Sequence, residues 1–197
     1  LILIAAMGSF AVSLATNSVV LGFLAGAAIG GLVALVVAFA SLTLGQSQVA
    51  VGFVLAMLCR DLSYFLGSPI MGKVGPRISQ VPIPLLDRIP ILGPLFFQQD
   101  VMTYLSFVLI FAAWFFIFRT RPGLVLRGMG EKPAAAYIRG ENVSRLQYVY
   151  AIVGGAIAGL AGPIYSLSVK AGWKGTISGL DGIGWIVLSI TIFGGWN

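Results

Sequence analysis

Few side chains in this 197-residue sequence could carry out covalent chemistry. The chain has no histidine, and its six carboxylates are scattered without an obvious pair. It contains no Gly-x-x-x-x-Gly-Lys-[Ser/Thr], His-Glu-x-x-His or Gly-x-Ser-x-Gly motif, which would indicate a nucleotide, zinc or hydrolase site respectively. We therefore expect no catalytic residue, no metal site, no cofactor and no enzymatic activity in this chain itself.

Two polar segments that contain glycine interrupt the apolar parts of the chain, Gly45–Gln48 and Gly179–Gly184. In transporters, such breaks leave half-helix ends and free backbone groups that face a solute, whereas elsewhere they are turns at the membrane surface. The pattern favours a turn for the first segment and leaves both interpretations open for the second. Trp173, Trp185 and Trp196 could stack on a sugar or base, but tryptophan more often anchors a helix at the membrane interface.

One pair of charges, Arg60 and Asp61, lies within an otherwise apolar stretch. Adjacent residues of a helix point about 100° apart, so these two do not form a good pair with each other. Arginine can extend its charged end to the interface, or each residue can pair with a neighbouring helix. Intramembrane charges also mark polar pathways. An arginine at the interface, or pairing with a neighbouring helix, is favoured, and a polar pathway stays open.

The composition shows which elements must position these residues. Hydrophobic residues make up 58% of the chain and charged residues 9%, and the first 59 residues carry no charge. A membrane-spanning helix needs about 20 apolar residues. The apolar runs are continuous and do not alternate with period two, as barrel strands would. We therefore predict an all-α, polytopic transmembrane helical bundle with about six membrane segments: 1–16, 19–44, 49–67, 101–118, 146–169 and 182–197.

Small residues recur at helical spacing in two of these segments. Gly22, Gly26 and Gly30 are spaced by four, as are Ala151, Gly155 and Gly159. Such faces let helix backbones approach closely in lipid, where no hydrophobic force drives helices together. The pattern favours static helix packing over a moving interface.

The distribution of basic residues predicts the orientation. The segment 119–145 holds six of the twelve basic residues against two acidic ones, whereas 68–100 holds three against two. One predicted span separates these loops, so they lie on opposite faces. By the positive-inside rule, 119–145 is cytoplasmic and 68–100 is an external loop, as is 170–181. The net charge of +6 is therefore assigned to membrane topology, and no nucleic-acid partner is expected.

A short helix is predicted within the basic loop, over Pro133–Arg139. Proline suits the first helical position, alanine favours helix, and Gly140 suits the residue after the end. A helix this short needs a partner surface, which could be the lipid interface or a cytoplasmic protein. Ser144 and Gln147 form a capping-box pattern that predicts the start of the next membrane helix.

The segment Gly130-Glu-Lys-Pro-Ala-Ala-Ala-Tyr-Ile-Arg-Gly-Glu-Asn-Val resembles the cytoplasmic loop of permease subunits of bacterial ABC importers. It is the counterpart of the Glu-Ala-Ala-x-x-x-Gly loop that docks onto the ATPase. The preceding Thr120-Arg-Pro-Gly-Leu and the glycine-rich stretch 154–163 also fit the family. The stretches 89–100 and 182–197 are similar to its simple-sugar and nucleoside branch. The resemblance implies an ATPase-coupling loop with Glu131, Pro133, Ala134, Ala135, Ala136, Arg139 and Gly140.

The resemblance also implies the rest of the assembly. Residues 1–197 would be part of one transmembrane permease domain, lacking both ends, in the inner membrane. Its partners would be a cytoplasmic ABC ATPase, an identical or homologous second permease, an external substrate-binding protein and the lipid bilayer. The solute would be a simple sugar or a nucleoside, with a pathway lined by Gln48, Asp181, Gly182, Gly184 and Trp185. The alternatives are a branched-chain amino acid permease and a passive channel, which would conduct without ATP.

Overall fold

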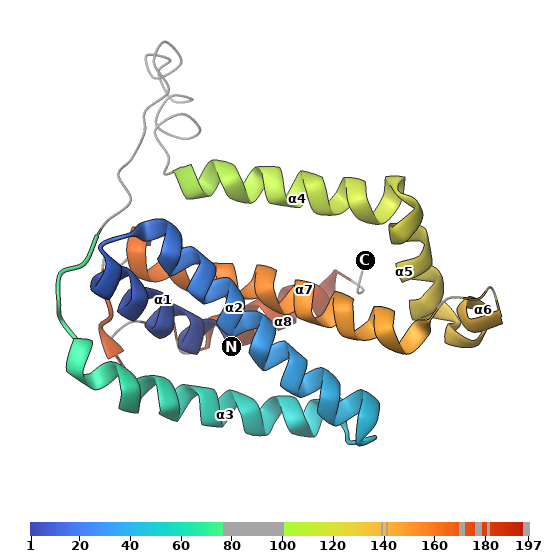
Figure 1. Cartoon of the computed structure of the whole chain (residues 1–197), viewed down its shortest axis with the longest axis horizontal. Coiled ribbons are helices and arrows are strands. Elements are labelled where there is room, and N and C mark those ends of the chain that lie inside the picture. Colours follow the sequence, from blue (N-terminus) through green and yellow to red (C-terminus); the bar gives the residue numbers. More distant parts are fainter. Residues whose placement is uncertain are drawn as a thin grey trace, which may run out of the picture. The chain divides into compact units, whose positions relative to one another are not determined.

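The computed structural model describes residues 1–76, 101–138, 140, 142–169, 172–175, 179–180 and 182–194, with the backbone alone at Ala134 and Ala135. Every regular element among these residues is helical (Figure 1), which confirms the all-α prediction. The chain divides into two compact units. One comprises Leu1–Arg77 and Ala151–Asn197, and the other comprises Ile78–Tyr150.

The elements follow the apolar runs of the sequence closely. The first unit contains α1 (Ile2–Thr16), α2 (Val19–Ala38) with the π-helix η1 (Phe39–Thr43), α3 (Gln48–Gly67) with the 3-10 helix η2 (Ser68–Ile70), most of α7 (Val143–Pro163) with the π-helix η4 (Ile164–Val169), and α8 (Ile183–Phe193). The second unit contains α4 (Val101–Arg119), α5 (Arg121–Glu131), α6 (Pro133–Ile138) and the first turns of α7.

Among the described residues, four helical segments are long and apolar enough to cross a membrane. They are Val19–Thr43, Gln48–Ile70, Val101–Arg119 and Val143–Val169. Two further apolar helices, α1 and α8, are shorter, with 15 and 11 residues. The helical membrane bundle is therefore confirmed, but the predicted number of six spans is not.

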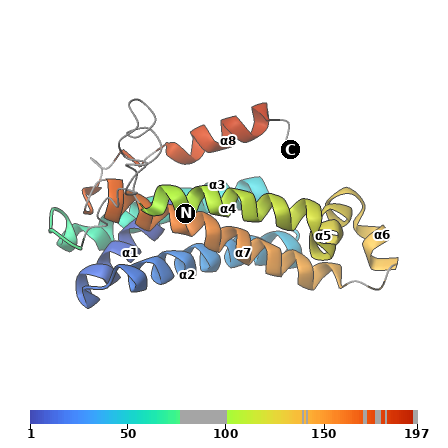
Figure 2. The same cartoon turned by 90° about the horizontal axis from the view of Figure 1, so that it is seen from above.

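Helix α1 is the most buried element of the first unit, where it contacts α2, α3 and η4. Its buried residues are mostly small, and they include Ala5, Ala6, Ser9 and Ser13. Small side chains bring neighbouring backbones close: a Cβ on Gly162 of α7 would lie 2.5 Å from the backbone nitrogen of Ala6. In contrast, α8 buries none of its residues, and Figure 2 shows it standing apart from α1 and α2.

The closest contact in this unit joins α2 and α7 through their glycines. A Cβ built on Gly30 would lie 2.7 Å from Gly159 Cα, and one on Gly155 would lie 2.7 Å from the Gly30 carbonyl oxygen. A Cβ on Gly26 would lie 2.7 Å from Pro163 Cδ. Real Cβ atoms do not approach backbone this closely, so hydrogen is the only side chain that fits. The glycine spacing in the two segments therefore reports direct packing of one helix on the other.

A tryptophan closes one end of the same unit. Trp173 is 1% exposed and lies in the segment after η4. Its indole packs against Gly67 and Tyr64 of α3, with ring centroids of Trp173 and Tyr64 6.3 Å apart. The Gly72 N–H donates to the Trp173 carbonyl oxygen at 3.0 Å. Within the described parts of the chain, however, no group accepts a hydrogen bond from the indole Nε1.

The helix contact can be tested with two adjacent glycines of α7. Gly155→Ala places a methyl group against Gly30 and Ala34, whereas Gly154→Ala places one in open space. Because overpacking typically costs about 1–3 kcal/mol, we expect Gly155→Ala to lower the melting temperature of the purified protein in detergent. Gly154→Ala should melt at or above the wild-type temperature. Equal melting of the two variants would show that this contact does not hold the helices together.

Candidate functional site

The basic loop contains a helix that the sequence interpretation missed. Helix α5 begins after Thr120, whose Oγ1 accepts a hydrogen bond from the Gly123 N–H at 3.2 Å and donates to the Phe116 carbonyl oxygen at 2.6 Å. Pro122 lies in the first turn. A threonine followed by proline within the first turn is a helix-start signal. It was available in the sequence, so α5 could have been found.

The corner between α4 and α5 is tight. A Cβ on Gly123 would meet the carbonyl groups of Phe116 and Ile117, at 2.5 Å from the Ile117 oxygen. The Tyr150 hydroxyl on α7 donates to the Pro122 carbonyl oxygen at 3.3 Å, and its ring lies 6.4 Å from that of Phe116. Figure 1 shows the resulting sharp turn of α5 away from α4. The direction of α5 is therefore fixed by backbone contacts and by α7.

The predicted short helix is present as α6, which begins at Pro133 and ends at Ile138. The predicted last residue, Arg139, lies outside the described residues. Gly140 adopts a φ of +86°, and its N–H donates to the Tyr137 carbonyl oxygen at 2.9 Å. The helix stop predicted at Gly140 is therefore confirmed.

The residues of α6 differ sharply in exposure. Ala136 is buried, whereas Tyr137 and Ile138 are 73% and 84% exposed. Glu131 ends α5, and the Lys132 N–H donates to the Gly128 carbonyl oxygen at 3.0 Å. The resemblance assigned the coupling loop to Glu131, Pro133, Ala134, Ala135, Ala136, Arg139 and Gly140, and this role stays a prediction. The structure also exposes two large apolar side chains, Tyr137 and Ile138, which sequence reasoning did not single out.

Helix α7 starts earlier than the predicted capping box. Its first residue is Val143, and the Arg145 N–H donates to Asn142 Oδ1 at 3.1 Å. Asn142 is therefore the capping residue, and Ser144 lies within the first turn. Asparagine and serine are about equally good caps, so the residue types alone could not decide between them.

The predicted pathway residues lie in the first unit. Gln48 is the exposed first residue of α3, after a turn in which Gly45 has a φ of +64°. Gly182 has a φ of +96° and precedes α8, while Gly184 and the exposed Trp185 lie in the first turn of that helix. Asp181 lies outside the described residues. These positions come from two elements, α3 and the start of α8.

One aromatic contact connects these two elements. The rings of Phe53 and Trp185 lie 6.1 Å apart. Phe53 is about one and a half helical turns from Gln48 along α3. Trp185 is thus near the segment of α3 that contains Gln48. The pathway role of these residues stays a prediction.

The two intramembrane charges are both exposed on α3. The Arg60 guanidinium lies 5.7 Å from the centre of the Tyr64 ring, one turn further along the same helix. Among the described residues, no group of three histidine, cysteine, aspartate or glutamate side chains could hold a metal ion.

Comparison with known proteins identifies the family. The whole chain, residues 1–197, matches the family of the branched-chain amino acid transport system, permease component. The chain belongs to this family. The resemblance seen in the loop 130–143 is therefore confirmed over the full length of the chain.

Three curated relatives carry transport names. A putative glucose ABC transporter permease protein, TsgC13 of Haloferax volcanii, is 32% identical over the whole chain and 60% of its own length. The nucleoside ABC transporter permease NupC of Lactococcus lactis and the guanosine ABC transporter permease NupQ of Bacillus subtilis are each 33% identical over 90% of the chain. The chain spans 57% of the length of each of these two. No solved structure matches this permease chain significantly.

The helix stop at the end of α6 can be tested with two glycines of the loop. A Cβ on Gly140 or on Gly128 would meet nothing within 4 Å, but only Gly140 has a positive φ. A residue with a Cβ costs about 1–2 kcal/mol in that conformation. We therefore expect Gly140→Ala to speed amide hydrogen exchange across α6, whereas Gly128→Ala leaves it unchanged or slower. The same exchange rates in both variants would contradict this role of Gly140.

Proposed function

We propose that this chain is the larger part of a membrane-spanning permease subunit of an ATP-driven importer. Membership of the permease family and the transport names of its relatives support the proposal. The observation that carries it is the short helix α6, which exposes Tyr137 and Ile138 between two longer helices. Such a helix is suited to a groove on a partner protein, because two large apolar side chains become buried there.

The partners follow from the same proposal. The sequence has no P-loop, so a separate cytoplasmic ABC ATPase would supply the energy and receive α6. A second permease subunit, identical or homologous, would complete the pathway, and an external binding protein would deliver the solute. The residues of the ATPase-coupling loop are Glu131, Pro133, Ala134, Ala135, Ala136, Arg139 and Gly140, to which Tyr137 and Ile138 are now added.

The solute is proposed to be small and polar, either a simple sugar or a nucleoside. Relatives named for glucose, nucleoside and guanosine transport support this choice. The family description favours a branched-chain amino acid as the alternative. The proposed pathway residues are Gln48, Asp181, Gly182, Gly184 and Trp185, and backbone groups freed at Gly182 would face the solute.

The mechanism follows from the connections of α6. Its two ends are set by the non-helical backbone at Lys132 and by Gly140, so it moves as one short rigid body. A shift of α6 would pass to α5 on one side and to α7 on the other. Because α7 contacts α2 through Gly155 and Gly159, it would carry the motion into the bundle. Rocking of packed helices is an established way to alternate access to a central site.

The docking role can be tested with two equally exposed apolar residues. Ile138 and Val74 are each 84% exposed, the first on α6 and the second after η2. In the full-length protein, Ile138→Asp should place a charge in the ATPase groove and lower copurification of the ATPase at least tenfold, together with uptake of labelled solute. Val74→Asp should leave ATPase binding unchanged.

If Ile138→Asp retains the ATPase and transports at the wild-type rate, α6 is not the docking element. Solute flux that persists without the ATPase would identify a passive channel instead. Copurification of the ATPase is measured without any solute. Uptake is measured separately with a sugar, a nucleoside and a branched-chain amino acid, so the solute need not be known beforehand.

The protein is proposed to lie in the inner membrane. In the proposed orientation, residues 119–145 face the cytoplasm and residues 68–100 face the outside. Lys73 and Lys132 are both exposed, and the single cysteine, Cys59, is buried. In a Cys59→Ala background, Lys73→Cys should react with a membrane-impermeant thiol reagent in intact cells. Lys132→Cys should react only after lysis. The reverse labelling pattern would overturn the orientation and the cytoplasmic docking of α6.

A further inference from the structure

Helix α4 presents a row of aromatic rings along one face. None of its residues is buried. Phe107, Phe111, Trp114 and Phe118 are spaced by four, three and four residues, so they share a face of the helix. The rings of Phe111 and Trp114 lie 5.8 Å apart, and those of Trp114 and Phe118 lie 6.3 Å apart. We call these four residues the aromatic face of α4.

Two arginines lie at the C-terminal end of this row, one on α4 and one on α5. The Arg119 guanidinium of α4 lies 5.9 Å from the centre of the Trp114 ring. The Arg127 guanidinium of α5 lies 5.1 Å from the centre of the Phe118 ring. In the part of the chain that the structure describes, no carboxylate forms an ion pair with either arginine. Two positive charges therefore lie over two neighbouring rings at the end of an apolar surface.

This arrangement matches the two ends of a phospholipid. A guanidinium has several donors in a planar fork, which suits bidentate binding of a phosphate. Rings stacked along a helix offer an apolar surface for an acyl chain that runs parallel to it. A zwitterionic headgroup brings no net charge to the two cations, whereas an anionic headgroup does. Charge complementarity therefore selects the anionic lipid.

We propose that the aromatic face of α4, together with Arg119 and Arg127, binds an anionic phospholipid. The headgroup phosphate lies on the two guanidiniums, and an acyl chain runs along the rings of Trp114, Phe111 and Phe107. This site shares no residue with α6 or with the proposed solute pathway. It does not depend on the transport function, because it requires only that α4 spans the bilayer.

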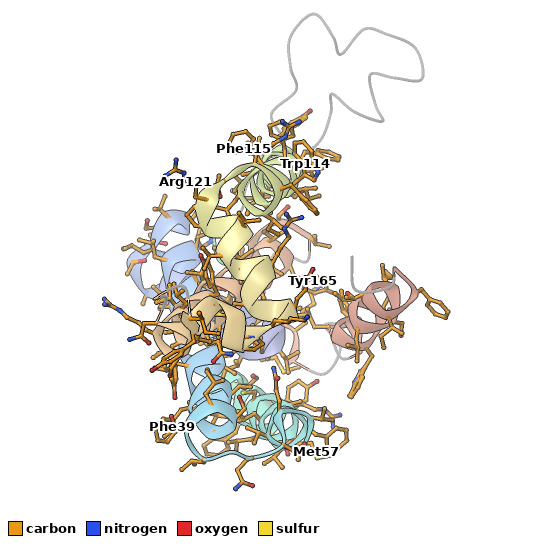
Figure 3. The ribbon with its side chains drawn as sticks, turned by 90° about the vertical axis from the view of Figure 1, so that its right-hand side faces the viewer. Phe39, Met57, Trp114, Phe115, Arg121 and Tyr165 are labelled. Carbon is orange, nitrogen blue, oxygen red and sulfur yellow. The ribbon has the colours of Figure 1, made fainter. Side chains whose placement is uncertain are left out.

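The same corner provides a matched control. Arg121 is the first residue of α5 and is exposed. Figure 3 shows its side chain on the opposite side of the corner from Trp114. Replacing Arg121 by glutamine therefore changes the net charge of the corner by the same amount as Arg127→Gln, without removing a group that faces the aromatic face.

The test uses the fluorescence of Trp114 in the full-length protein. Every other tryptophan is replaced by phenylalanine, which breaks no side-chain hydrogen bond at Trp173 among the described residues. The protein is placed in bilayers in which either phosphatidylglycerol or phosphatidylcholine carries bromine on its acyl chains. Bromine quenches a tryptophan that it contacts. We expect an enrichment of the anionic lipid at Trp114 on the order of tenfold over its bulk fraction.

The variants identify the groups responsible. Arg119→Gln with Arg127→Gln should abolish the preference for the anionic lipid, while quenching by both lipids continues. Arg121→Gln should retain the preference. A protein whose single tryptophan is introduced by Phe193→Trp, at a position that is 92% exposed on α8 and has no proposed pathway role, should be quenched equally by the two lipids.

Three results would overturn the proposal. Equal quenching of Trp114 by the two lipids would show that no headgroup is selected. A preference that survives in the double variant would place the anionic lipid elsewhere. Quenching by neither lipid would show that a protein surface, such as a second copy of the chain, covers the aromatic face of α4.

Discussion

The structure depends on the backbone contact between α2 and α7. In lipid, burial of apolar side chains gains little, because the solvent is as apolar as leucine, so helices associate through close packing. Gly26 and Gly30 on one helix and Gly155 and Gly159 on the other leave out the Cβ atoms that would clash with the facing helix. The contact fixes α7 in the first unit, while the first turns of the same helix lie in the second. It therefore determines where any force applied at the loop can act.

The loop 119–145 is also shaped mainly by backbone interactions rather than by large side chains. Two side chains accept hydrogen bonds from backbone N–H groups at helix starts, the Thr120 hydroxyl and the Asn142 carboxamide. Two glycines do what a larger residue could not: Gly123 allows a close backbone approach, and Gly140 adopts a positive φ. Each of these ends or turns a helix without a large buried core. The large side chains Tyr137 and Ile138 therefore stay exposed.

Much of this fold could be predicted from sequence, since membrane helices are long apolar runs and glycines at spacing four mark close packing. Gly140 was also predictable, because a helix end favours a residue that tolerates positive φ. Helix α5 was missed because Arg121–Glu131 carries charges and three glycines and reads as a loop. The exposure of Tyr137 and Ile138 could not be predicted, because a six-residue helix is too short for periodicity to indicate which side faces its neighbours.

The unpaired indole of Trp173 has a consequence for the end of the bundle that it closes. A buried N–H without an acceptor costs about 1–3 kcal/mol relative to one in water. Van der Waals packing against Gly67 and Tyr64 therefore holds the indole in place, whereas hydration of its N–H would favour the released state. Release of Trp173 would return that N–H to solvent, at the cost of the packing and of the hydrogen bond from the Gly72 N–H to the Trp173 carbonyl oxygen. The free-energy difference between packed and released Trp173 is therefore smaller than it would be if the indole N–H were hydrogen-bonded in the packed state.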